Sequence, residues 1–211
     1  FEKNPTLISK YWIKAQKRLY ELYPKKTFIF KTHNSRIKYK NHLFTNEKYT
    51  RGFIYIVRDP RSVLVSAKNH YNYPTYEHGL NDLLSNQHLS LAKYHVLPEF
   101  LLSWQTHYLS WKEYLNQYPN IGLIIKYEDL IKKPKDNLYK IIKFFEQKHS
   151  LKFDTIKFNN AVKSVNFINL QKKENELGFN EKGVSASKFF RKGKVDEWKN
   201  KVPKDIIKII E

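Results

Sequence analysis

The chain contains no cysteine and no methionine, and only 6 of its 211 residues are glycine. The absence of cysteine excludes disulfide scaffolds, zinc–thiolate sites, iron–sulfur clusters and thiol nucleophiles. No apolar run approaches the roughly 18 residues of a membrane-spanning helix, so we expect no membrane span. Because glycine is scarce and no repeat or low-complexity linker is present, nothing marks a domain boundary, and we expect one domain over residues 1–211.

Aromatic side chains and positive charge are what the chain has in excess. Aromatic residues make up 16% of the sequence and hydrophobic residues 41%, which is enough to build one core. The formal net charge is +19, with +11 in residues 1–58, −2 in residues 79–130 and +10 in residues 131–211. This charge favours a polyanionic ligand. Only six of the 39 basic residues are arginine, and three of those six fall in two short motifs.

The apolar patterning predicts strands that alternate with helices. Short apolar runs predict strands at residues 27–31, 53–57 and 121–126, while helical periodicity appears at residues 6–23, 63–70, 98–118 and 134–148. This order is typical of an α/β fold with a central parallel sheet and helices on both faces. Ligands of such folds bind beyond the carboxyl ends of the strands, so the residues that follow each strand are the candidate site.

The second predicted strand is followed by the sequence RDPRSVLVS, residues 58–66. Arg58 lies at the strand end, and Pro60 suits the first turn of a helix whose free N–H groups attract an anion. Ser66 adds a hydroxyl donor two turns later. In the alternative interpretation, Asp59 merely caps the helix and Arg61 pairs with a surface acid.

Three other segments carry candidate functional residues. Lys31 and His33 follow the first predicted strand, where a histidine can take a proton near neutral pH; the alternative is a purely structural histidine. The late sequence FRKGK, residues 190–194, is a basic loop that could either clamp a phosphate or simply be solvated. Tyr127 follows the third strand and could stack on a base or belong to the core.

Four of these segments, in this order, resemble motifs of the sulfotransferase family that uses 3′-phosphoadenosine 5′-phosphosulfate (PAPS). FKTHN resembles the family's KTH element, YIVRDPRSVLVS its 3′-phosphate signature, IKYEDLIKKP its YEDL segment and FFRKGKVDEWKN its RKGxxGDWKN loop. The likeness covers most of the chain. It implies a three-layer, P-loop-like α/β fold with a central parallel sheet flanked by helices.

The resemblance also implies a role for nine residues. His33 would deprotonate an acceptor hydroxyl, and Lys31 would stabilise charge on the transferring sulfuryl group. Phe167 lies in the segment SVNFINLQKKE, which resembles the family's TSFxxMK segment with its base-stacking aromatic ring. The residues that would bind PAPS are Arg58, Ser66, Tyr127, Phe167, Arg191, Lys192 and Gly193. The implied reaction transfers the sulfuryl group to a hydroxyl, releases adenosine 3′,5′-bisphosphate (PAP) and needs no metal.

The sequence departs from the family pattern in two places. The family has an early strand followed by a PKSGTTW-like loop around the 5′-phosphosulfate, whereas no glycine precedes Gly52 here. We therefore expect a single sulfotransferase domain, N-terminally incomplete, that lacks this strand and loop. The late loop has Asp196 and Glu197 before Trp198, where the family has Gly-Asp.

Two alternative functions stay open beside a sulfotransferase. The charge of +19 also suits a basic nucleic-acid-binding module, which would show no preference for PAP over AMP. A different P-loop-related nucleotide-dependent transferase would need a GxxxxGK[ST] loop, and the sequence has none. The resemblance favours a small-molecule or sugar acceptor with a hydroxyl, bound by residues 71–79 and 80–97, and no nucleic acid. The histidine base resembles the soluble type, which implies the cytoplasm, and a homodimer is left open.

Overall fold

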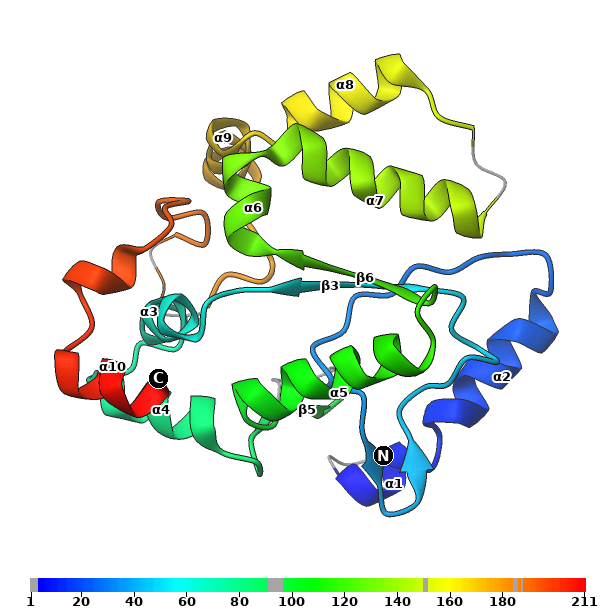
Figure 1. Cartoon of the computed structure of the whole chain (residues 1–211), viewed down its shortest axis with the longest axis horizontal. Helices are drawn as coiled ribbons and strands as arrows, with labels where there is room; N and C mark the ends of the chain where they lie inside the picture. Colours follow the sequence, from blue (N-terminus) through cyan, green and yellow to red (C-terminus); the bar gives the residue numbers. More distant parts are fainter. Residues whose placement is uncertain (1–3, 91–96, 150–151, 184–185, 187) are drawn as a thin grey trace. The chain divides into compact units, whose positions relative to one another are not determined.

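The computed structural model describes residues 4–90, 97–149, 152–183, 186 and 188–211 (Figure 1). The chain forms two compact units. Unit 1 comprises Phe1–Tyr55 and Asp82–Gly122, and unit 2 comprises Ile56–Asn81 and Leu123–Glu211. The expectation of one domain over the whole chain stays a prediction.

Strands β3 (Phe53–Val57) and β6 (Gly122–Lys126) form a pair and run in the same direction (Figure 1). The backbone N–H of Phe53 donates to the carbonyl oxygen of Ile121 at 2.9 Å, just before β6 begins. A side chain in place of Gly122 would collide with the Phe53 ring, because an added Cβ would lie 2.2 Å from it. Both strands were predicted from their apolar runs, and both are confirmed.

The first predicted strand, residues 27–31, is wrong. No residue of this segment belongs to a strand, and the apolar side chains of Phe28, Ile29 and Phe30 are 41%, 78% and 68% exposed. An apolar run becomes a buried strand only when a neighbouring strand supplies hydrogen bonds and another layer covers it. Among the described residues, no strand pairs with this segment.

Unit 1 is built on helices α1 (Pro5–Ser9), α2 (Trp12–Leu22) and α5 (Trp104–Gln117). The predicted helix 6–23 is thus two helices, and the predicted helix 98–118 begins only at residue 104. The helix starts later than predicted because β5 (Glu99–Phe100) pairs with β4 (Leu89–Ser90). Ser103 then caps the N-terminus of α5. Two further short strands form the hairpin β1 (Lys38–Tyr39) and β2 (His42–Leu43). The core of the unit contains Trp111, Tyr114 and Ile121.

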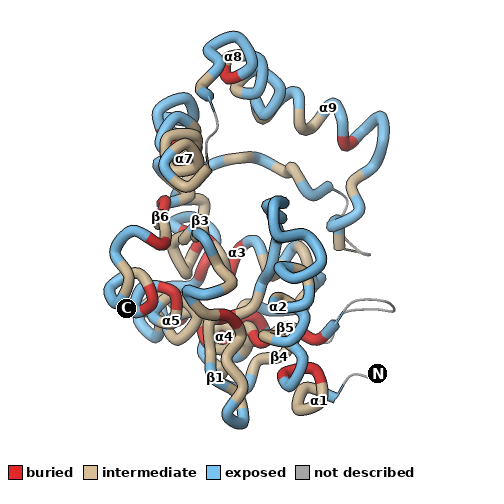
Figure 2. Tube along the Cα trace, turned by 90° about the vertical axis from the view of Figure 1, so that its right-hand side faces the viewer, coloured by how far each residue is buried: buried red, intermediate tan, exposed pale blue. Residues whose placement is uncertain are grey.

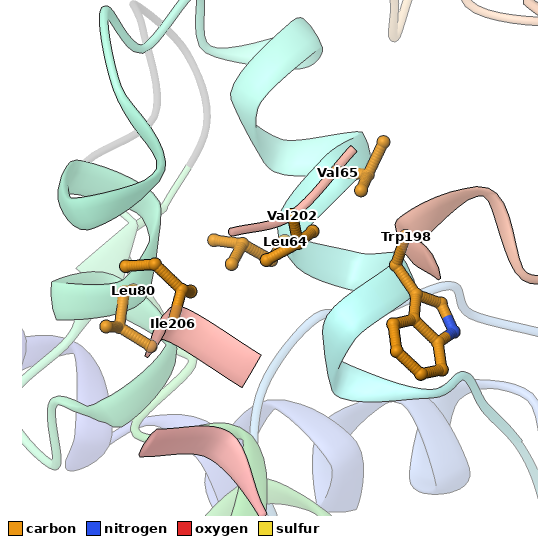
Figure 3. Packing of buried hydrophobic residues seen from close by; sticks show 6 residues of the cluster. All are labelled: Leu64, Val65, Leu80, Trp198, Val202 and Ile206. Carbon is orange, nitrogen blue, oxygen red and sulfur yellow. The ribbon is translucent and has the colours of Figure 1, made fainter. Parts of the chain in front are cut away.

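Unit 2 packs helix α3 (Pro60–His70) against short C-terminal helices. The core contains Leu64, Val65, Leu80, Trp198, Val202 and Ile206 (Figure 3). Trp198 comes from the 3₁₀ helix η1 (Glu197–Asn200), and Ile206 from α10 (Lys204–Ile210). Because their side chains converge on Leu64 and Val65, the C-terminal segment holds α3 in place.

The remaining helices follow β6 or connect the core elements. They are α4 (Tyr76–Leu84), α6 (Tyr127–Lys132), α7 (Pro134–Lys148), α8 (Thr155–Ser164) and α9 (Phe167–Leu177). Helix α7 has the predicted bounds, whereas α4 occupies part of the segments expected as acceptor loops, of which residues 91–96 lie outside the described residues. Helices α8 and α9 are mostly exposed (Figure 2). None of the described helices combines the length and the apolar character needed to cross a membrane.

Candidate active site

The turn from β3 into α3 places Arg58 at the strand end, as predicted. Its guanidinium lies over the ring of Tyr127, with the guanidinium carbon 4.5 Å from the ring centroid. The next backbone N–H, of Asp59, donates to Glu128 Oε1 at 3.1 Å. The residues that follow β3 and β6 therefore meet, which brings the predicted phosphate-binding arginine onto the predicted adenine-binding tyrosine.

Asp59 and Arg61 hold this turn in shape. An Asp59 carboxylate oxygen accepts the Arg61 backbone N–H at 2.9 Å, and its other oxygen accepts from the Arg61 guanidinium at 2.8 Å. Burial raises the pKa of Asp59, but these hydrogen bonds outweigh it and leave the pKa below its usual value. The Arg61 guanidinium also bonds Glu211 and lies 3.7 Å from the Trp198 ring centroid. For this pair, the structural interpretation is therefore correct.

Ser66 lies on the exposed side of α3. The Ser66 hydroxyl is therefore accessible on the helix that Arg58 and Asp59 introduce. This accessibility is what a hydroxyl donor to a ligand requires.

Helix α9 holds the RKG loop through one of its faces. A Cβ on Gly193 would lie 2.7 Å from the Phe167 ring, and Gly193 has a φ of +58°, so both the space and the backbone favour glycine. Gln171 Nε2 donates to the Phe190 carbonyl oxygen at 2.8 Å. The buried Glu174 carboxylate accepts the N–H groups of Phe189 and Phe190 at 2.6 and 2.9 Å. These contacts within unit 2 fix the course of the loop.

Glu197 forms ion pairs with two cations of the same loop and with Lys201. Its carboxylate oxygens lie 2.8 Å from Arg191 Nη2, 3.0 Å from Lys192 Nζ and 3.2 Å from Lys201 Nζ. Burial raises the pKa of this carboxyl, but hydrogen bonds from Lys192, Arg191 and Lys201 prevail and lower it to about 2. Two of the predicted phosphate-binding residues are therefore already paired with an acid of their own chain.

A pocket of about 260 Å³ lies beside Arg191. It is lined by Lys68, Asn69, Asn72, Tyr73, Ala186, Lys188 and Arg191. Three of these residues are cationic and none is acidic. The pocket is therefore suited to a negatively charged group.

The predicted catalytic residues Lys31 and His33 belong to unit 1, and both side chains are exposed. The backbone at His33 is fixed from two sides. Its N–H donates to Glu99 Oε1 at 2.9 Å, and its carbonyl oxygen lies 3.2 Å from His107 Nε2. His33 therefore projects from an anchored peptide.

His107 links this peptide to the interior of unit 1. Because a carbonyl oxygen only accepts, His107 Nε2 must carry the proton, and Nδ1 then accepts from the Tyr55 hydroxyl at 2.8 Å. Burial lowers the pKa of His107, which favours this neutral form, and burial raises the pKa of Tyr55.

The residues after His33 are tied down in the same way. Asn34 Oδ1 accepts the Phe100 N–H at 2.8 Å, and the Asn34 carbonyl oxygen accepts from Trp111 Nε1 at 3.1 Å. The Ser35 N–H then donates to the Phe100 carbonyl oxygen at 2.8 Å. Helix α5 and strand β5 therefore determine the course of the chain that carries His33.

Several supporting residues were not found from the sequence. Glu197 and His107 carry no local signal, because their roles depend on partners distant in the fold. Phe167, Gln171 and Glu174 are spaced at i, i+4 and i+7, so they share one helix face. That spacing could have indicated a helix face that binds a loop.

Comparison with known proteins identifies the family. A family model described as a sulfotransferase domain matches residues 9–211. The chain belongs to the sulfotransferase domain family. A search of curated proteins found no match.

This sulfotransferase domain also resembles solved structures. Mouse sulfotransferase SULT7A1 complexed with PAP has a TM-score of 0.56 and 23% identity, and the match covers 77% of this chain and 56% of that one. Retinol dehydratase, with retinol and PAP or with androsterone and PAP, gives TM-scores of 0.53 and 0.52 at 19% identity; these matches cover 76% and 75% of this chain and 45% of each dehydratase chain. These likenesses confirm the predicted α/β, P-loop-like fold. The domain spans about half the length of these structures.

The departure at Asp196 fits the local backbone of the sulfotransferase domain. Asp196 has φ +63° and ψ 18°, the left-handed conformation, at the position where the family motif has glycine. Aspartate adopts this conformation more readily than most residues with a Cβ. The loop can therefore keep its course despite the substitution.

Proposed function

We propose that this sulfotransferase domain binds PAPS through unit 2 and transfers its sulfuryl group to a hydroxyl of a small-molecule or sugar acceptor. One observation carries the proposal: all seven predicted PAPS-binding residues belong to unit 2, although they span residues 58 to 193. Contacts within that unit already join Arg58 to Tyr127 and Phe167 to Gly193. The two catalytic candidates belong to unit 1.

The residues of unit 2 suit a nucleotide that carries a phosphate. The opening turn of α3 offers backbone N–H groups and the positive end of the helix dipole. Arg58 and Arg191 offer planar donor groups for phosphate oxygens, and Ser66 offers an accessible hydroxyl. The rings of Tyr127 and Phe167 supply flat apolar surfaces for a base. Charge, donors and aromatic surface are thus present in one unit.

Unit 1 would supply the proton acceptor. When bound, PAPS supplies the activated sulfuryl group. The exposed ring of His33 would remove the proton from the acceptor oxygen, and general-base action of this kind contributes ~10² to 10⁴ in rate. Lys31, two residues earlier, would place positive charge near the developing negative charge. Hydrogen bonds to Glu99 and His107 would hold the backbone of His33 in one position.

We extend the proposal to the setting of the reaction. The resemblance to the soluble type supports a cytoplasmic location and a soluble acceptor rather than a nucleic acid, and a homodimer is compatible with it. Among the described residues, no three His, Asp or Glu side chains gather as metal ligands. We assign the stabilisation of charge on the sulfuryl group to the chain's own cations, as the resemblance implies.

The decisive experiment is calorimetric titration of the chain with PAP, with Arg58→Ala compared against Arg51→Ala. Arg51 is an exposed arginine of unit 1, so its replacement removes the same charge outside the proposed site. We expect Arg58→Ala to lose about 2 kcal/mol or more of binding free energy, as for a charge-assisted hydrogen bond, and Arg51→Ala to bind like wild type. Equal affinity for both variants refutes the assignment.

A second titration separates the proposal from nucleic-acid binding. A PAPS site must prefer PAP to AMP, because only PAP carries the 3′-phosphate. A basic nucleic-acid-binding module would show no such preference and would bind duplex DNA with a steep salt dependence. Affinity for DNA without discrimination between PAP and AMP would therefore favour the alternative.

A further inference from the structure

Glu197 occupies an unusual place among the carboxylates of unit 2. Its side chain is 13% exposed, and three cations surround it. Two of them, Arg191 and Lys192, are the loop residues assigned to the phosphate. The third, Lys201, lies one helical turn later and has no assigned ligand role.

The Arg191 contact occupies a pair of guanidinium donors that could also hold a phosphate. Nη2 donates to Glu197 Oε2 at 2.8 Å, and Nη1 contacts Glu197 Oε1 at 3.4 Å. This two-point geometry is the one by which arginine grips a phosphate. The N–H pair that faces Glu197 cannot hold a phosphate and the carboxylate together, so a phosphate that binds at this pair must displace the carboxylate.

Charge places the carboxylate in competition with a phosphate. Like charges repel at the separations found within one small site, while the cations attract both. Without a ligand, the carboxylate offsets the mutual repulsion of Arg191, Lys192 and Lys201. With a phosphate bound, it would add repulsion instead.

We propose that Glu197 is an internal counter-ion that the nucleotide 3′-phosphate displaces from Arg191 and Lys192, and that it thereby sets the affinity for PAP. The inference rests on the proposed function. Lys201 remains as the partner of the carboxylate after the exchange. Glu197 thus shapes the loop before binding and weakens the hold on the product.

Another titratable group of the same unit faces this cluster. Burial raises the pKa of Tyr76 on α4; the nearby charge of Glu197 adds to the rise, and Arg191 opposes it. Tyr76 stays protonated near neutral pH, so its charge does not change during nucleotide binding. The exchange therefore involves the carboxylate and the three cations alone.

The test compares Glu197→Gln with Glu146→Gln by calorimetric titration with PAP and with AMP. Glu146 on α7 pairs with Lys143 at 2.7 Å, and its side chain is 20% exposed, so the control removes a similarly placed charge away from the loop. We expect Glu197→Gln to bind PAP at least fivefold more tightly. AMP lacks the 3′-phosphate, so its affinity should stay within twofold, as should PAP binding by Glu146→Gln.

The outcomes separate this inference from the proposed function. If wild type binds PAP and Glu197→Gln binds it equally or more weakly, the counter-ion role is wrong and the nucleotide site stands. If neither protein binds PAP, both proposals fail. An equal gain in affinity for PAP and AMP also overturns the inference, because the exchange requires the 3′-phosphate.

A second variant covers the case in which Glu197→Gln does not fold. Lys201→Gln leaves Glu197 with only Arg191 and Lys192, so the carboxylate should hold them more tightly. Lys199→Gln is the matched control, because it removes the same charge two residues away from a more exposed pair with Asp196. We expect Lys201→Gln to weaken PAP binding at least threefold more than Lys199→Gln. Equal weakening contradicts the exchange.

Discussion

Unit 2 fixes its candidate ligand-binding side chains directly, whereas unit 1 fixes only the backbone that carries its candidate base. In unit 2, Arg58 rests on Tyr127 and Arg191 is paired with Glu197. In unit 1, hydrogen bonds hold the His33 peptide, and the ring is exposed. This difference suits the roles proposed for the two units, which are phosphate binding for unit 2 and proton removal for unit 1.

A phosphate site gains from preorganised donors, because ordering long cationic side chains costs conformational entropy. A proton acceptor must instead reach an acceptor hydroxyl whose position varies with the substrate. A fixed peptide with a free ring meets that need. Substitutions that touch the fixed parts of each unit should therefore differ sharply from substitutions of the exposed ring.

The largest effect is expected at Glu174, which holds the RKG loop in unit 2. Glu174→Ala leaves the partly buried N–H groups of Phe189 and Phe190 without their charged acceptor, so the loss of two hydrogen bonds should lower the unfolding free energy in urea by about 3 kcal/mol. Glu176→Ala is the control on the same helix, since its exposed pair with Lys172 should contribute under about 0.5 kcal/mol. Similar losses for both variants would show that the loop is not held in this way.

A smaller effect is expected at His107, which holds the backbone of unit 1. His107→Phe removes the hydrogen-bond partner of the His33 carbonyl oxygen and of the Tyr55 hydroxyl. We therefore expect the free energy of unfolding to fall by about 2 kcal/mol at pH 7. His78→Phe replaces an exposed histidine bonded to Thr75 and should change stability by under about 0.5 kcal/mol. Chemical unfolding measures both, and a loss at His78 as large as that at His107 would contradict the anchoring role.

The same histidine predicts a pH dependence. Burial lowers the folded-state pKa of His107 below its unfolded value of about 6.5, so below that pH the unfolded chain binds more protons than the folded chain. The contribution of His107 to the free energy of unfolding is therefore complete above about pH 6.5. It falls as the pH drops toward the lower pKa of the folded state. Wild type should lose more stability than His107→Phe between pH 7 and pH 5, and parallel profiles would oppose this account.

The smallest effect is expected at His33 itself. Because its ring is exposed, His33→Ala should change the unfolding free energy by under about 0.5 kcal/mol. PAP affinity should stay within twofold, since the nucleotide residues belong to unit 2. Calorimetry and urea unfolding check both values. A loss as large as that of His107→Phe would erase the contrast between anchored backbone and exposed ring.

The sequence predicted the elements whose signals are local. Strands β3 and β6 are apolar runs, and Pro134 marks the first turn of α7. The positions of Arg58 and Tyr127 then follow from the rule that ligands bind at strand ends. Residues 27–31 look just as strand-like, but strand formation needs a partner that no local pattern reveals.

The residues that hold the candidate site residues in place could not be predicted from the sequence, for the same reason. Glu197 lies six residues from Arg191, and nothing in the spacing shows that its carboxylate faces the guanidinium. His107 lies 74 positions from His33 and meets its carbonyl only after the unit has folded. The resemblance indicated which residues would bind a ligand, whereas the structure shows what holds them.

The exposed segment Phe28–Phe30 has a consequence for the chain in solution. Three adjacent exposed apolar side chains are a template for aggregation between copies, and charged neighbours oppose it. Lys25 and Lys26 precede the segment and Lys31 follows it. These lysines act as gatekeepers by electrostatic repulsion, so their protection weakens as salt screens the charge. Low ionic strength should therefore keep concentrated solutions of this protein monodisperse.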